Sequence, residues 1–180
     1  MDITYINNLN GETKLFGEKW VEYNKDNAFI INDKGKNLEL IESYNFGNKS
    51  EKISIKLIII KERIDMSFMF YNCTNLKYLS NISKWTKTKI INTYYLFYNC
   101  ENLDLPDISD WDISKINNFH LMFCNCLSSV NLDKWENNIR FKDSLIFGFS
   151  YSYYKKFAAD LPNSIFYDFG QYIDNNYFFN

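Results

Sequence analysis

The chain contains the stretch Phe70-Tyr71-Asn72-Cys73, which recurs as Phe97-Tyr98-Asn99-Cys100 and again as Phe123-Cys124-Asn125-Cys126. The leading phenylalanines are separated by 27 residues (70 to 97) and by 26 residues (97 to 123). A tryptophan follows each stretch, at Trp85, Trp111 and Trp135. Because cysteine and tryptophan are both rare and share one period, we interpret the region as a tandem repeat, the sequence signature of stacked-repeat architectures.

Each unit combines two apolar patterns. Residues Met66, Met69, Phe70 and Cys73 follow the i, i+3, i+4, i+7 spacing of one helix face. The leucine spacings that follow are typical of a strand edge: Leu76, Leu79 and Ile82 in the first unit, and Leu103, Leu105 and Ile108 in the second. The patterns predict a short helix, a turn and a short strand in each repeat, a unit that must stack on its neighbours to bury its apolar face.

A family resemblance rests on these motifs. The strings Met69-Phe70-Tyr71-Asn72-Cys73-Thr74-Asn75-Leu76 and Ile82-Ser83-Lys84-Trp85 resemble the BspA-like leucine-rich repeat of surface-type proteins from mycoplasmas, other bacteria and protists. The resemblance covers about residues 64–136 and extends to 150. It implies an α/β fold, a short right-handed leucine-rich-repeat solenoid of helix-turn-strand repeats of about 26 residues. It also implies, for many relatives, a cell-surface or host-contact role.

Three regions are expected on this basis: an N-terminal α+β cap at 1–50, leucine-rich repeats at 51–150 and an aromatic-rich C-terminal cap or tail at 151–180. The cap should contain a helix from about Glu18 to Asn24 and a hairpin in which 28–31 and 38–40 flank a glycine turn. Alternation from Ile53 to Ile59 predicts a strand leading into the first repeat. The aromatic tail covers the last repeat or, alternatively, forms an exposed interface through which the chain self-associates.

Charge and hydropathy exclude some classes of function. The net charge of −2 argues against a nucleic-acid partner. The N-terminus lacks a basic and then apolar signal segment, and the longest apolar run, Leu57 to Ile60, is too short to span a bilayer. As written, the chain is expected in the cytoplasm, whereas the family resemblance implies the cell surface.

The sequence offers no catalytic, metal or cofactor constellation. His120 has no second histidine and no paired nucleophile, so we expect no enzyme. Asp107-x-Ser109-Asp110-x-Asp112 lacks the glycine and distal glutamate of a calcium loop. Cys73, Cys100 and Cys126 hold one register, which favours a ladder of small buried side chains over a zinc site.

We therefore predict a non-catalytic scaffold for protein–protein interaction; the alternative is an adhesin-like, host-contact surface module. The partner, a protein or peptide, is expected on the outward strand positions Lys77, Tyr78, Asp104 and Asp107. The structural ladder should comprise Phe70, Cys73, Trp85, Phe97, Cys100, Trp111, Phe123, Cys126 and Trp135. A platform for stacking bases or sugars is the alternative for the tryptophans. The aligned asparagines Asn72, Asn99 and Asn125 are expected to satisfy backbone groups in turns.

Overall fold

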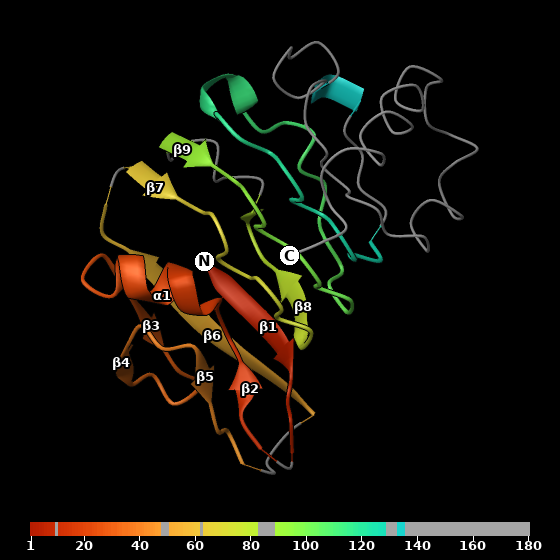
Figure 1. Ribbon diagram of the computed structural model, residues 1–180. Helices are drawn as coiled ribbons and strands as arrows, with labels where there is room; N and C mark the ends of the chain where they lie inside the picture. Colours follow the sequence, from red (N-terminus) through yellow and green to blue (C-terminus); the bar gives the residue numbers. More distant parts are fainter. Residues whose placement is uncertain (10, 48–50, 62, 83–88, 129–132, 136–180) are drawn as a thin grey trace, which may run out of the picture.

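The computed structural model of the protein describes residues 1–9, 11–47, 51–61, 63–82, 89–128 and 133–135 (Figure 1). Its largest element is a five-stranded sheet in which every neighbouring pair of strands is antiparallel. In spatial order the strands are β4 (Asn37–Glu39), β3 (Ala28–Ile31), β6 (Lys52–Ile59), β1 (Asp2–Ile6) and β8 (Leu76–Leu79). The sheet therefore joins residues from the N-terminal region to the first repeat.

The local predictions for the N-terminal half are confirmed. Helix α1 spans Glu18–Asn24. Strands β3 and β4 form the predicted hairpin, with Gly35 at a φ of 74° in the turn. In β6, Ile53, Ile55 and Leu57 are buried while the residues between them are exposed, which is the alternation expected of a strand with one face on the core.

A close backbone contact holds α1 against the first repeat. The Gly17 amide, just before the helix, donates to the Met69 carbonyl at 3.0 Å. A Cβ atom at Gly17 would lie 2.1 Å from the Phe68 carbonyl oxygen, so only glycine allows this approach. The Trp20 indole, buried on α1, donates to the Asp65 carbonyl at 3.0 Å.

Four short strands and two short 3-10 helices complete the described elements. Strands β2 (Thr13–Lys14) and β5 (Ser43–Tyr44) form an antiparallel pair, and β7 (Arg63–Asp65) and β9 (Lys89–Asn92) form a parallel pair. The 3-10 helices are η2 (Ile113–Lys115) and η3 (Asp133–Trp135). Within the described part of the chain, no helix combines the length and the apolar character that crossing a bilayer requires.

The predicted fold class is wrong. The described chain is mostly antiparallel sheet with α1 as its α-helix, and it is not a helix-turn-strand leucine-rich-repeat solenoid. The predicted helix at Met66 to Cys73 is absent. Its residues form consecutive tight turns, and Phe68 and Asn72 have φ angles of 61° and 58°. An α-helix cannot continue through left-handed residues, because they interrupt its hydrogen-bond ladder.

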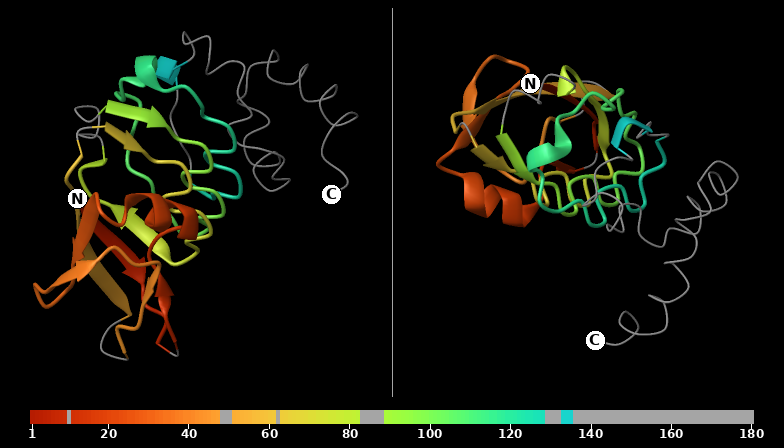
Figure 2. Two further views of the ribbon diagram at one scale, coloured as in Figure 1. Left: turned by 60° about the vertical axis from the view of Figure 1, so that its left-hand side comes forward. Right: turned by 90° about the horizontal axis from the view of Figure 1, so that it is seen from above.

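The corresponding turns of three repeats lie on one another, and we call residues 66–73, 93–100 and 119–126 the turn stack (Figure 2). Alternate amides donate to the next repeat, at 2.7–3.1 Å: Phe68 to Tyr94, Phe70 to Leu96, Asn72 to Tyr98, Tyr95 to His120, Phe97 to Met122 and Asn99 to Cys124. Other amides close turns within one repeat, as from Tyr71 to the Phe68 carbonyl at 3.1 Å. Backbone groups that a helix would pair internally therefore pair between repeats.

The inner side of the turn stack continues the hydrophobic core. Phe70, Phe97 and Phe123 are fully buried and form a column, with ring centroids 5.7 and 5.6 Å apart and nearly parallel planes. Trp111 and Trp135 are also buried, with centroids 6.2 Å apart. Trp85 and the predicted cap or tail at 151–180 lie outside the described residues.

Candidate functional site

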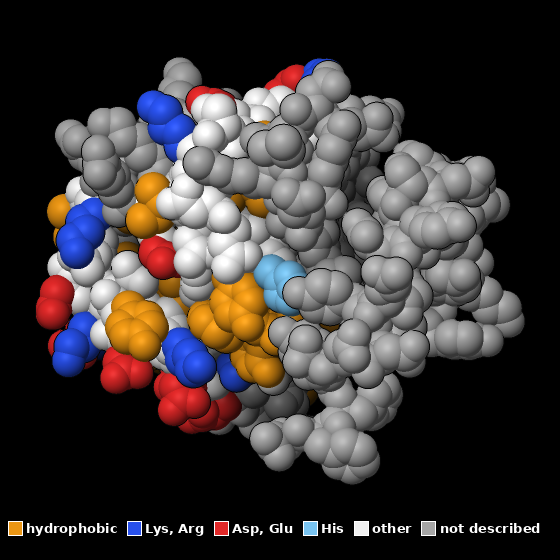
Figure 3. All heavy atoms as spheres, turned by 45° about the horizontal axis from the view of Figure 1, so that its top comes forward, with side chains coloured by type: hydrophobic (Ala, Val, Ile, Leu, Met, Phe, Trp, Pro, Cys, Tyr) orange, Lys and Arg blue, Asp and Glu red, His pale blue; other side chains and the backbone are white. Residues whose placement is uncertain are grey.

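The outer side of the turn stack carries a group of aromatic side chains, which we call the aromatic face. It consists of Phe68, Tyr71, Tyr94, Tyr95, Tyr98 and His120, all half-buried. In Figure 3 hydrophobic side chains gather beside the single histidine of the chain, with lysines at the border of the patch. Because these rings are half-buried, each keeps part of its surface available for contact.

The rings of the aromatic face stack between repeats. Phe68 stacks on Tyr95 with centroids 5.3 Å apart, and Tyr71 stacks on Tyr98 at 5.0 Å. Tyr94 lies 6.1 Å from the His120 ring. Edge contacts, such as Tyr95 to Tyr98 at 5.0 Å, link the columns sideways. The rings are thus held in place by one another before any partner arrives, which reduces the entropy lost on binding.

The backbone of the turns directs these rings outward. Phe68, Tyr95 and Leu121 occupy one repeat position and all have positive φ angles of 55–61°. In each repeat an asparagine or an aspartate lies two residues before the position that Ser67, Tyr94 and His120 share. There Asn92 accepts from the Tyr94 amide at 3.0 Å, and Asn118 accepts from the His120 amide at 2.9 Å. Such side chain to backbone bonds fix the start of each turn.

Burial shifts the pKa values of three ionisable rings of the face, Tyr95, Tyr98 and His120, toward the neutral form. Burial, followed by a hydrogen bond with Tyr94, raises the pKa of Tyr95. Burial also raises the pKa of Tyr98 and lowers the pKa of His120. The cation next to these rings is Lys19 of α1, whose Nζ lies over the Phe68 ring, 4.7 Å from its centroid. The electron-rich rings therefore contact a positive charge already.

Three of the residues predicted to bind a partner lie together on the strand side. Tyr78 is 43% exposed and forms a parallel bridge with Asp104, whose amide donates to the Lys77 carbonyl at 2.7 Å. Tyr78 pairs with Thr4 of β1 on its other side. Lys77, Tyr78 and Asp104 therefore form a small mixed surface with one aromatic side chain.

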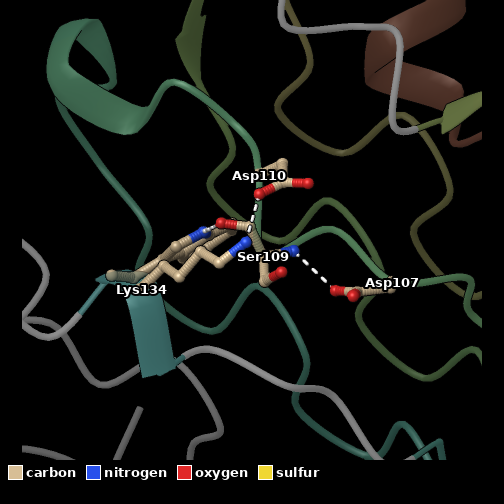
Figure 4. A network of polar contacts seen from close by, with 5 residues as sticks. Asp107, Ser109, Asp110 and Lys134 are labelled. Atoms are coloured by element: carbon tan, nitrogen blue, oxygen red, sulfur yellow. Dashed lines mark hydrogen bonds and ion pairs between the residues drawn. The ribbon is translucent and has the colours of Figure 1, made fainter.

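Asp107, the fourth predicted residue, takes part in a different set of contacts (Figure 4). Its carboxylate accepts from the Ser109 amide at 2.8 Å, and hydrogen bonds from Ser109 lower its pKa. The neighbouring Asp110 forms an ion pair with Lys134, in which both side chains are exposed. Asp107 thus closes a turn, and its carboxylate is engaged in that turn.

The cysteines line the interior. Cys73, Cys100 and Cys126 are buried free thiols, and the Cys100 thiol lies 3.1 Å from the Phe70 carbonyl one repeat earlier. Burial raises the pKa of Cys126 to about 11 and also raises the pKa values of Cys73 and Cys100. Among the described residues, no group of three or more His, Cys, Asp or Glu side chains is placed to hold a metal ion.

Sequence reasoning missed the aromatic face. The sequence does show that Tyr94 and His120 share one repeat position, which is that of Ser67. On the helical backbone that the sequence predicted, however, the neighbouring aromatic side chains would lie on different faces of the helix. The visible signal is that Tyr71 and Tyr98 share one repeat position, and Phe68 and Tyr95 share another.

Comparison with known proteins identifies a family. Neither a curated protein nor a solved structure matched the chain. The family described as "Mycoplasma protein of unknown function, DUF285" matches residues 42–160, which include the whole turn stack. This match spans more than half of the 180 residues. The chain therefore belongs to the DUF285 family of Mycoplasma proteins of unknown function.

Proposed function

We propose that the protein is a non-catalytic binding module that holds a protein or peptide partner on its aromatic face. The observation that carries this proposal is the set of neighbouring half-buried rings on a hydrogen-bonded turn stack. Tyrosine and other aromatic side chains dominate the energy of protein interfaces, because they bury a large area at a low cost in side-chain entropy.

Rigidity supports the same function. A binding surface works best when its side chains are ordered before the partner arrives, since ordering on contact costs affinity. Here Tyr95 is in contact with Phe68, Tyr71, Tyr94 and Tyr98. The backbone beneath it is held by the bond from its amide to the His120 carbonyl at 3.1 Å.

A display experiment tests this proposal. The immobilised chain is used to select from a random-peptide library, and the affinities of the enriched peptides are measured. Replacing Tyr71→Ser and Tyr94→Ser together should weaken these peptides by about tenfold or more, as expected for hot-spot aromatics. The matched control, Tyr78→Ala with Asp107→Lys on the strand side, should leave the affinities unchanged. Unchanged affinities in the Tyr71→Ser and Tyr94→Ser variant would refute the proposal, and so would a loss of binding in the control variant alone.

A second candidate function is contact with a host at the cell surface, as in proteins of the BspA-like kind. It is supported by the family, which is also found in BspA-like surface proteins. Brief protease treatment of intact native cells provides the test. Removal of the protein without cell lysis would support surface display, whereas full protection of the protein, together with cleavage of a known surface protein, would exclude it.

A further inference from the structure

The aromatic face contains a site that is already occupied by a cation. Lys19 projects from α1 and places its Nζ atom over the Phe68 ring, 4.7 Å from the centroid. An ammonium group in this position is attracted by the negative face of the ring. Tyr95 stacks on the same Phe68 ring, with the ring planes 26° apart, so the cation contacts one member of a two-ring column.

The groups around this site suit a positive charge. The Asp65 carboxylate belongs to the turn that leads into Phe68, where it accepts from the Ser67 amide at 2.8 Å and from the Asn92 side chain at 3.4 Å. Ser67 directly precedes Phe68, and Asn92 holds the Tyr94 amide. Burial raises the pKa values of Tyr95 and Tyr98 and lowers the pKa of His120, so these three rings bring no charge of their own that would repel a cation at neutral pH.

We propose that the partner inserts an arginine or lysine side chain over the Phe68–Tyr95 column, and that Lys19 occupies this position in the free protein. The inference rests on the proposed function and specifies the chemistry of its partner. Arginine suits the site best, because its planar guanidinium stacks on an aromatic ring and leaves its N–H groups free to donate hydrogen bonds. Lys19 then acts as an internal competitor, which the partner displaces.

The test uses two synthetic peptides and the full chain. One is a Gly-Ser peptide with two arginines, and the other is the same peptide with citrulline in place of arginine. Titration is followed by NMR of the tyrosine rings. The arginine peptide should bind at least about fivefold more tightly than the citrulline peptide, because citrulline keeps the shape and loses the charge. Equal affinities would overturn the inference.

Lys19 provides the sharper test. Lys19→Met removes the internal cation and keeps a good helix former in α1, so the arginine peptide should bind about two- to fivefold more tightly. The matched control is Lys36→Met, in the exposed turn between β3 and β4, where removing the charge should change nothing. Unchanged or weaker binding of the arginine peptide to Lys19→Met would contradict the inference, because Lys19 would then not compete with the arginine for the ring.

Phe68→Leu separates the inference from the proposed function. Leucine keeps an apolar side chain and removes the ring quadrupole, so it should abolish the preference for arginine over citrulline. If library-selected peptides still depend on Tyr71 and Tyr94 but show no preference for arginine in the unmodified chain, the inference fails and the proposed function stands. If the selected peptides do not depend on these tyrosines, the proposed function itself fails.

Discussion

At the scale of single residues, the molecule depends on left-handed backbone positions. Asn72, Asn99 and Asn125 have φ angles of 57–59°, and asparagine tolerates this region because its side chain bonds to nearby backbone. Phe68 and Tyr95 have similar φ angles without that advantage. Each of these two left-handed residues lowers the stability of the fold by about 1–2 kcal/mol. The hydrogen bonds to the next repeat and the ring contacts offset this cost.

Substitution of Asn99 tests this explanation. Asn99→Gly should be nearly neutral, since glycine adopts a positive φ freely, whereas Asn99→Val should lower the free energy of unfolding by about 2 kcal/mol or more. Urea denaturation measures both values. If valine proved as stable as glycine at this position, Asn99 would not be left-handed in solution.

Thiol labelling tests the interior at the same scale. Burial raises the pKa of Cys124 and of Cys126 to about 11, so at pH 8 only about one part in a thousand is the reactive thiolate. Cys124 is 8% exposed and Cys100 is fully buried. In the native protein Cys124 should react first and slowly, and Cys100 only on unfolding, as followed by mass spectrometry. Rapid labelling of Cys100 without denaturant would be incompatible with the buried column.

At the scale of elements, the sequence predicted the buried face of each repeat better than its backbone. Met66, Met69, Phe70 and Cys73 are all buried, as their spacing predicted. The same spacing is satisfied by consecutive turns, since a turn closed from residue i+3 to residue i also brings i and i+3 to one side. Periodicity alone therefore could not separate the turn stack from a helix.

Elements that depend on local signals were predictable. Helix α1 and the β3–β4 hairpin follow from an amphipathic segment and a glycine turn, both of which are short-range features. The aromatic face was not predictable, because it arises from hydrogen bonds between residues 25 or 26 positions apart, such as Tyr95 to His120. Such pairing depends on the stacked fold and leaves little trace in a single repeat.

The phenylalanine column provides the prediction for this scale. Phe97 is fully buried and stacks on Phe70 and Phe123, so Phe97→Ala should reduce the free energy of unfolding by about 3–5 kcal/mol. Phe97→Leu should cost about 1–2 kcal/mol, because most of the apolar volume remains. Chemical denaturation distinguishes the two. A cost below 1 kcal/mol for alanine would show that the column is not tightly packed.

At the scale of the whole molecule, the N-terminal region and the repeats form one structure. Strand β8 of the first repeat is hydrogen-bonded to β1, which pairs on its other side with β6. Helix α1 adds a second connection, through the Gly17 approach and through Trp20. The sheet thus covers the start of the turn stack and joins it to a common core.

Gly17→Ala tests this connection. The added methyl group would lie 2.1 Å from the Phe68 carbonyl oxygen, a backbone atom that cannot move away cheaply. We expect a loss of about 2–3 kcal/mol in unfolding free energy and weaker peptide binding, since Phe68 belongs to the aromatic face. Gly11→Ala is the control, because its methyl group would meet only the Asn8 side chain. Equal stability of the two variants would argue against the close contact.

Each repeat of the turn stack pairs its backbone with the next repeat through consecutive turns. NMR couplings transmitted across hydrogen bonds measure this directly, because they connect a donor amide to the carbonyl that accepts it. The structure predicts couplings from the Phe70 amide to the Leu96 carbonyl and from the Phe97 amide to the Met122 carbonyl. A coupling from the Phe97 amide to the Thr93 carbonyl, four residues earlier, would indicate a helix and contradict the account.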